Sequence, residues 1–221
     1  MTDSPRIFLI RHALVVPAAR LIAYGSMDVA LCEETLAADR PAYDWLASRL
    51  PRGANWYCTP LARTRATAMA VFAAGYPEAE LTELPAFVEQ HLGEWQGLSH
   101  EEFTSLLRDP PHPFWMHGAD ERPPGGETLS DVVARVGPAL EAVADEADDR
   151  GVVIVAHGGS IRAALAHAGA FTPYQALQFS VKNLSLTTLE REGGHWRIRT
   201  VNEQPPSGPP MAALASREGS G

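Results

Sequence analysis

The sequence predicts an α/β fold with three layers, in which a mostly parallel sheet lies between two layers of helices. An antiparallel hairpin is expected at the C-terminal edge of this sheet. Short apolar strands alternate with helical segments along the chain, a pattern that is typical of parallel sheets. One strand, Val152–Val155, consists of β-branched and aliphatic residues alone, as expected for a central strand buried on both faces. The length of 221 residues fits one domain.

The first half of the chain supplies three expected strands and three expected helices. The strands are Arg6–Ile10, Trp56–Cys58 and Glu80–Val88, the last of which is interrupted at Pro85. The helices are Glu33–Leu50, Leu61–Ala74 and Ser99–Arg108. Pro41 must kink or restart the first helix, and Ser99 and Glu102 have the spacing of a capping box.

The second half begins with Asp109–Gly126, which is rich in proline and glycine and is expected to form a loop or lid. The helices Thr128–Asp149 and Ile161–Ala168 flank the central strand, and Leu177–Glu190 and His195–Val201 are expected to pair around Gly193-Gly194. We therefore expect a single domain over residues 1–202, with an insertion at about 99–127. Residues 203–221 are rich in Pro, Gly, Ser and Ala and are expected to be a disordered tail.

Composition excludes several functional classes. With 18 basic and 27 acidic residues the net charge is −9, whereas proteins that bind nucleic acids or anionic membranes usually carry a basic face. Two cysteines cannot form a disulfide framework or a zinc site, and no apolar run reaches the length of a membrane span. We expect a cytoplasmic protein, and its oligomeric state is not predicted. Lys182 is the only lysine, and arginine binds phosphate well, so a small phosphorylated substrate fits.

Two of the predicted strands end in histidine. Arg11-His12 follows the first strand, and His157-Gly158-Gly159 follows the central strand. Ligands of parallel α/β folds bind beyond the carboxyl ends of the strands, so we expect both imidazoles at one edge of the sheet. A Gly-Gly pair at the start of a helix also exposes backbone N–H groups that bind anions. The sequence therefore predicts an anion site that contains two histidines.

Five segments resemble motifs of the histidine phosphatase superfamily, in its phosphoglycerate-mutase-like branch. In order along the chain they are Leu9–His12, Cys58–Thr64, Glu89–Gly97, Pro124–Thr128 and Val155–Arg162. They resemble the family's Arg-His-Gly, S-S-P-L-x-R-A, E-x-x-x-G-x-W-E-G, P-G-G-E-S and V-S-H-G-G-x-I-R patterns. The resemblance spans residues 7 to about 202.

The resemblance implies a role for each matching residue. His12 is the nucleophile that forms a phosphohistidine, and Glu89 is the general acid and base. The phosphoryl group is expected in a cage of positive charge and N–H donors. That cage consists of Arg11, Arg63, a protonated His157 and the Gly158 amide. No cofactor and no metal is implied.

Several assignments compete with alternatives. Arg65 is a rival of Arg63, and Glu94 is a rival of Glu89. Glu127 either orients an arginine or only caps the following helix. The remaining expectations are structural: Arg162 is a packing residue, Trp95 and Trp115 pack in the core, and most of His91, His100, His112 and His117 lie on the surface.

Departures from the family pattern favour hydrolysis over mutase activity. Ala13 replaces a glycine, Leu14–Ala18 contains no asparagine, and Ser26 stands where arginine is common. A less polar pocket grips a second anionic group poorly, so we expect a phosphomonoester hydrolase, similar to the small α-ribazole phosphatases. The alternatives are phosphoglycerate-mutase-type transfer, a non-catalytic phosphate-binding module, and a serine hydrolase at Ser160, which lacks the G-x-S-x-G elbow.

Overall fold

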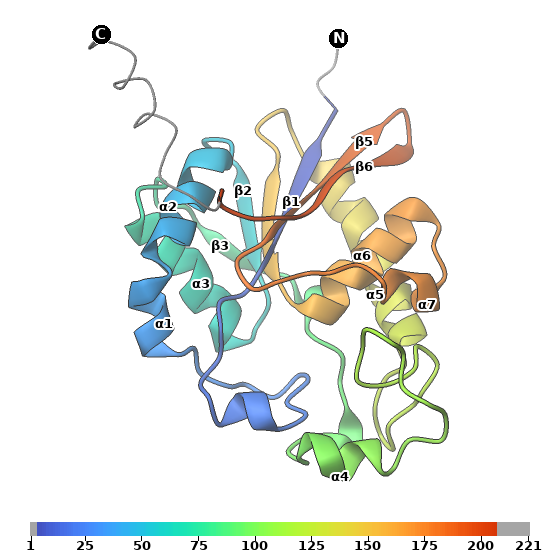
Figure 1. The fold of residues 1–221 in the computed structure, drawn as a ribbon. Helices are drawn as coiled ribbons and strands as arrows, with labels where there is room; N and C mark the ends of the chain where they lie inside the picture. The colour runs from blue at the N-terminus through green and yellow to red at the C-terminus, as the bar shows by residue number, and fades with distance from the viewer. Residues whose placement is uncertain (1–3, 207–221) are drawn as a thin grey trace, which may run out of the picture.

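A six-stranded sheet forms the centre of the molecule (Figure 1). The structure is a computed structural model, and it describes residues 4–206. The strand order is β3-β2-β4-β1-β5-β6. The strands span Arg6–Arg11 (β1), Asn55–Cys58 (β2), Leu81–Glu83 (β3), Val152–Ala156 (β4), Leu186–Glu192 (β5) and His195–Glu203 (β6). Strands β1 to β4 are parallel, and β5 and β6 complete one edge as an antiparallel hairpin, which confirms the predicted sheet.

Helices cover both faces of the sheet. One layer contains α1 (Glu33–Ala38), α2 (Arg40–Arg49) and α3 (Ala62–Ala73), and the other contains α5 (Leu129–Glu146), α6 (Gly158–Gly169) and α7 (Pro173–Ala176). The short helix α4 (His100–Thr104) and the 3₁₀ turns η1 (Ala19–Leu21), η2 (Pro85–Phe87) and η3 (Gly93–Trp95) lie in the connecting loops. The predicted three-layer architecture is confirmed.

Alternation along the strands divides the interior into two cores. Ile7 and Leu9 of β1 pack with α5 and α6, whereas Phe8 and Ile10 pack with α2 and α3. Successive side chains of a strand point to opposite faces, so a central strand must be apolar at every position. All five residues of β4 are buried, as the β-branched pattern predicts.

Proline explains two of the observed boundaries. The segment predicted as helix over Glu33–Leu50 is two helices, and Pro41, which was expected to kink or restart it, lies in the first turn of α2. The third strand ends at Glu83 because Pro85 starts η2. The helix predicted from Ser99 keeps its capping box but ends at Thr104.

The C-terminal hairpin also differs from the prediction. Its first strand begins at Leu186 rather than Leu177, because α7 and a loop come first. Helix α6 starts at Gly158 rather than Ile161, so its first turn contains the Gly-Gly pair. Glu203, predicted as the start of the tail, is the last residue of β6 and pairs with Leu186. The rest of the predicted tail, from residue 207 on, lies outside the described residues.

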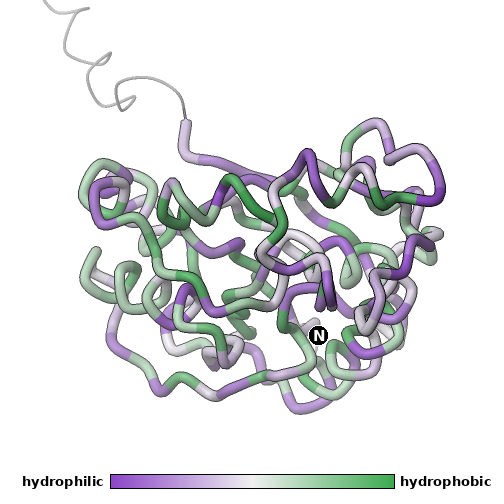
Figure 2. The backbone as a smooth tube through the Cα atoms, turned by 90° about the horizontal axis from the view of Figure 1, so that it is seen from below, coloured by the Kyte–Doolittle hydropathy of each residue, from purple (hydrophilic) through white to green (hydrophobic). Residues whose placement is uncertain are grey.

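The carboxyl ends of β1, β2 and β4 meet at one edge of the sheet, at the bottom of Figure 1. Long connections cover this edge, among them the segments with η1 and α4. Figure 2 views the molecule from this side, and the tube there alternates between hydrophobic and hydrophilic stretches. Within residues 4–206, no helix has the length and apolar character needed to cross a membrane.

Candidate active site

His12 and His157 lie face to face at the carboxyl edge of the sheet. Arg11 of β1 is in register with Ala156 of β4, so the next residue of each strand emerges at the same level. The His12 N–H donates to the Ala156 carbonyl oxygen over 3.0 Å. The two ring centroids are 5.1 Å apart, at an interplanar angle of 58°. The structure thus brings together the two histidines that the sequence singled out.

The His12 ring has one fixed tautomer. Its Nδ1 lies 2.7 Å from the Ala13 carbonyl oxygen, and a carbonyl only accepts, so Nδ1 carries the proton. Burial lowers the pKa of His12 well below its usual value, and the nearby charges of Arg63 and Arg11 act in the same direction. The neutral ring therefore keeps an electron pair on Nε2, which is the form a nucleophile requires.

His157 is also neutral, which differs from the protonated ring that was expected. Its Nδ1 accepts from Nε of Arg63 over 3.2 Å, and its Nε2 lies 2.9 Å from Oγ1 of Thr59. An arginine Nε only donates, so the His157 proton must be on Nε2. Burial lowers the pKa of His157 well below its usual value, and His12, Arg63, Arg11 and Arg135 add to this. The Ser160 hydroxyl accepts from the His157 backbone N–H over 3.2 Å.

Arg63, rather than Arg65, points into the site. Arg63 is only 1% exposed, and besides His157 it donates to the carbonyl oxygens of Met27 (2.6 Å) and Gly25 (2.8 Å). Arg65 lies on the surface, where Nη2 is 3.4 Å from Oε1 of Glu83. The family register and the geometry thus select the same arginine.

Glu89, rather than Glu94, faces the start of α6. The Gly159 N–H lies 3.0 and 3.1 Å from the two carboxylate oxygens of Glu89, and the Gln90 N–H donates to Oε1. Glu94 is exposed, and its backbone N–H donates to Pro124. The first turn of α6 therefore already holds one negative group, the Glu89 carboxylate.

Glu127 orients an arginine and does not cap α5. Its carboxylate accepts two bonds from Arg135, at 2.8 and 3.0 Å, and a third from the His91 N–H. Burial raises the pKa of Glu127, but these hydrogen bonds outweigh it, and the net pKa is lowered. Arg135 also donates to the backbone carbonyls of Ala86 and Glu89, so the pair fixes the segment that carries Glu89. Thr128 caps the helix.

Arg11 lies across the first turn of α6, close to a second arginine. Its Nη1 donates to the Val181 carbonyl oxygen over 2.5 Å, while Nε is buried and has no partner within the described part of the chain. Arg162 donates to the carbonyls of Gly158 and Phe179, both over 3.0 Å. Burial, with the charge of Arg11, lowers the pKa of Arg162 to about 10. The expected structural role of Arg162 fits these contacts.

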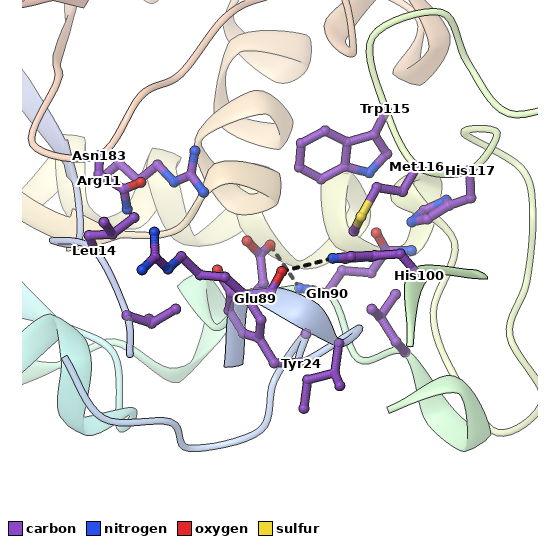
Figure 3. Close-up of a pocket in the computed structure, with 15 residues that line it drawn as sticks. Arg11, Leu14, Tyr24, Glu89, Gln90, His100, Trp115, Met116, His117 and Asn183 are labelled. Atoms are coloured by element: carbon purple, nitrogen blue, oxygen red, sulfur yellow. Dashed lines mark hydrogen bonds between the residues drawn. The ribbon is translucent and has the colours of Figure 1, made fainter. Parts of the chain in front are cut away.

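Beside Arg11 and Glu89 there is a cavity of about 310 Å³ (Figure 3). His12, Arg63 and His157 do not line it. The other lining residues are Leu14, Val15, Arg20, Ile22, Tyr24, Gly25, Gln90, Leu92, His100, Trp115, Met116, His117 and Asn183.

Sequence reasoning missed several of these residues. Asn183 donates from Nδ2 to the His12 carbonyl oxygen over 2.7 Å, from a segment that was predicted as strand. His117 was expected on the surface and Trp115 in the core. Both line the cavity, and His117 is 2% exposed. His112 is likewise buried, at 5% exposed. Trp95 packs in a small core with Phe103, as predicted.

The arrangement suits transfer of a phosphoryl group. It offers a neutral imidazole with an electron pair, buried guanidinium groups, and a carboxylate at the start of a helix. Within residues 4–206, no three His, Cys, Asp or Glu side chains gather in a way that would hold a metal ion.

Comparison with known proteins agrees with this chemistry. The sequence model of the histidine phosphatase superfamily (branch 1) matches residues 7–204. A glucosyl-3-phosphoglycerate phosphatase of Mycobacterium tuberculosis is 41% identical over 121 residues, which cover 49% of this chain and 51% of that protein. A 2,3-bisphosphoglycerate-dependent phosphoglycerate mutase 2 of Gloeobacter violaceus is 30% identical over 143 residues, or 57% and 63% of the two chains. The matches thus span about half to two thirds of these curated relatives.

Solved structures give longer matches. A mycobacterial glucosyl-3-phosphoglycerate phosphatase superposes with a TM-score of 0.75 at 28% identity, over 90% of this chain and 99% of that one. A putative α-ribazole-5′-P phosphatase of Escherichia coli shares the fold, with a TM-score of 0.75 at 17% identity over 91% and 97% of the chains.

Proposed function

Because the chain belongs to the histidine phosphatase superfamily, branch 1, we propose that it hydrolyses small phosphomonoesters through a phosphohistidine at His12. The observation that carries this proposal is the fixed His12 tautomer, with its proton on Nδ1 and an electron pair on Nε2. Phosphatases and mutases among the relatives support phosphoryl chemistry of this kind.

In the first step, Nε2 of His12 bonds to phosphorus while the bond from phosphorus to the alcohol oxygen breaks. Charge spreads over the equatorial phosphoryl oxygens, and Arg11, Arg63 and the first amide of α6, that of Gly158, are the proposed stabilising groups. Arg11 brings a buried Nε that has no partner in the described residues. A phosphate beside His157 would also favour the protonated form of that ring, which restores the expected cation.

Glu89 is the proposed proton carrier. Its carboxyl group gives a proton to the leaving alkoxide, and its carboxylate then takes one from the water that attacks the phosphohistidine. The bond from His12 to phosphorus breaks, inorganic phosphate leaves, and both side chains return to their starting forms.

Hydrolysis is favoured over mutase transfer by the walls of the cavity. A mutase must hold a second anionic group and keep water from the phosphohistidine. Apolar side chains form most of the wall here, among them Leu14, Val15 and Ile22. Over the aligned residues the mycobacterial phosphatase has the higher identity of the two curated relatives, 41% over 121 residues against 30% over 143.

The His12→Ala variant tests the mechanism. With 4-nitrophenyl phosphate as substrate, we expect kcat to fall by about 10⁴-fold or more, because the variant lacks the nucleophile. The acid-labile phosphoenzyme formed by the unmodified protein should be absent. The His195→Ala variant is the matched control, because His195 is exposed on β6 and distant from the site in sequence and topology.

Turnover and a phosphoenzyme in His12→Ala at the level of the control would overturn the mechanism. Product analysis with 3-phosphoglycerate and 2,3-bisphosphoglycerate distinguishes the alternatives. Release of inorganic phosphate supports hydrolysis, and formation of 2-phosphoglycerate would show a mutase.

A further inference from the structure

We infer that the alcohol part of the substrate is apolar and uncharged, and that it rests against Trp115 in the cavity next to Glu89. This inference depends on the proposed phosphatase function and names the class of substrate within it. Phosphomonoesters of aromatic or similarly apolar alcohols belong to this class.

The cavity has two ends of different character (Figure 3). Arg11, Leu14 and Asn183 lie at one end of the view, and Trp115, Met116 and His117 lie at the other, with Glu89 between them. The proposed acid must reach the bridging oxygen of the substrate, so it marks the boundary between phosphate and alcohol. The alcohol then extends toward Trp115 and Met116.

The Trp115 ring is held in place by Arg162. The Arg162 guanidinium carbon lies 4.2 Å from the ring centroid, in the range of a cation–π contact. Two backbone carbonyls, of Gly158 and Phe179, fix that guanidinium in turn. The indole is therefore a pre-organised wall, and binding against it orders few side chains.

Neighbouring side chains extend the apolar wall. Tyr24, Ile22, Leu92 and Met116 all line the cavity. Its volume of about 310 Å³ is at the lower end of the range for ligand pockets, roughly 300–1,000 Å³. A group of the size of an aromatic ring suits such a space.

His117, which with His100 is one of the two histidines that line the cavity, is uncharged. His117 donates from Nδ1 to the Gly118 carbonyl oxygen over 2.8 Å, which leaves Nε2 as an acceptor. Burial lowers the pKa of His117, although Gly118, Glu121 and Glu89 oppose this shift. A neutral acceptor suits a hydroxyl or an amide of the substrate and gives no attraction to a carboxylate.

Arg20 is the competing feature. It is exposed and also lines the cavity, so a substrate with a carboxylate or a second phosphate is the rival class. The rigid aromatic wall favours the apolar class, because Arg20 would lose side-chain entropy on closing over an anion. The experiment therefore includes a substrate of each class.

Three substrates with leaving alcohols of similar basicity separate binding from leaving-group chemistry. They are 2-phenylethyl phosphate, ethyl phosphate and 3-phosphoglycerate. We expect kcat/KM for 2-phenylethyl phosphate to exceed that of each of the other two by about tenfold or more, because only its ring is buried.

Variants locate the source of this preference. In Trp115→Ala, we expect the preference for 2-phenylethyl phosphate over ethyl phosphate to fall by about tenfold. The Trp115→Phe variant should keep most of this preference, because its side chain is still aromatic. Phe114→Ala is the matched control, because Phe114 is the adjacent residue of the same loop, is 70% exposed and does not line the cavity.

Two results would overturn the inference. One is a wild-type preference for 3-phosphoglycerate that Arg20→Ala abolishes, and the other is an equal loss in Trp115→Ala for all three substrates. In both cases the phosphomonoesters are still hydrolysed, so the proposed function stands. Failure of the proposed function would give a different result, namely no hydrolysis of any substrate and no phosphoenzyme at His12.

Discussion

Gly159 allows Glu89 to reach the start of α6. A Cβ on this residue would lie 2.3 Å from Oε1 of Glu89, closer than real Cβ atoms approach such an oxygen. The backbone angle is not in the left-handed region, so glycine is required for space and not for conformation. Gly159 therefore makes room for the Glu89 carboxylate and donates its N–H to it. The sequence had instead suggested that the N–H groups of both glycines bind the phosphate.

The Gly159→Ala variant should separate activity from stability. The methyl group forces Glu89 away from the Gly159 N–H, and misplacement of a catalytic group by about 1 Å can cost about 10²-fold in rate. We expect kcat with 4-nitrophenyl phosphate to fall by about 10- to 100-fold, while the thermal midpoint changes by only a few degrees. Steady-state kinetics and a melting curve measure the two effects.

Gly118→Ala is the control for this variant, because a Cβ there has only an ordinary contact, 4.0 Å from Glu121. Activity of Gly159→Ala equal to that of Gly118→Ala would contradict the assigned role of the Gly159 contact.

Among the individual site residues, the sequence could predict those that directly follow a strand or lie within a recognisable motif. His12 and His157 follow β1 and β4, so topology alone places them together. Asn183 and His117 enter from loops whose course depends on tertiary packing, and no periodicity marks them. No asparagine follows His12 directly in the sequence, and the one that donates to the His12 carbonyl oxygen, Asn183, comes from the other end of the described chain.

Helix α5 carries an arginine that fixes a neighbouring loop. Arg135 connects Glu127, before the helix, with the carbonyls of Ala86 and Glu89. The fork of its guanidinium group makes these contacts from one rigid plane, which a lysine does not reproduce. Arg135 is therefore a positioning residue for the proposed acid.

The Arg135→Lys variant should lower kcat by about tenfold or more with 4-nitrophenyl phosphate, since Glu89 loses its fixed backbone. We expect KM to change less than kcat, and the pH profile of kcat to shift, because the variant acts on the proton carrier. Arg122→Lys serves as the control, since Arg122 pairs with Asp131 at the exposed start of α5. A lower melting temperature with unchanged kcat and pH profile would reduce Arg135 to a structural residue.

Element types were predictable where local patterns and burial agree. β4 and α5 carry unambiguous patterns, and both were found within a few residues. The strand predicted at Leu177 fails because apolar residues there pack between α6, α7 and the sheet without pairing as strand. Apolar runs of this length fit either kind of packing, and only the tertiary structure decides.

Four buried histidines link the stability of the whole molecule to pH. Burial lowers the pKa values of His12, His157, His117 and His112 in the folded protein. In the unfolded chain these rings protonate near pH 6.5. Below that pH the unfolded state binds more protons than the folded state, so stability falls as the pH falls.

We expect the free energy of unfolding in urea to decrease from pH 6.5 to pH 5.5 by up to about 1 kcal/mol for each ring that stays neutral. The His117→Gln variant should show a smaller decrease, because one of these rings is absent. His195→Gln, at an exposed position, should match the unmodified protein. An identical slope in His117→Gln would contradict the linkage.

The net charge of −9 acts on a different length scale from the site. The proposed phosphomonoester would approach against the overall field, and Arg11 and Arg63 are the groups proposed to hold it at short range. Dissolved salt screens the long-range repulsion between protein and substrate more strongly than it weakens the short-range contacts of the two arginines.

The central place of β1 has a consequence for how the chain folds. Ile7 pairs with Val152 on one side and with Leu189 on the other, so β1 is synthesised well before either of its neighbours in the sheet. Such distant pairings slow folding and expose unpaired strand edges in the meantime. The backbone that presents His12 is therefore completed late, once β4 and β5 have joined β1 in the sheet.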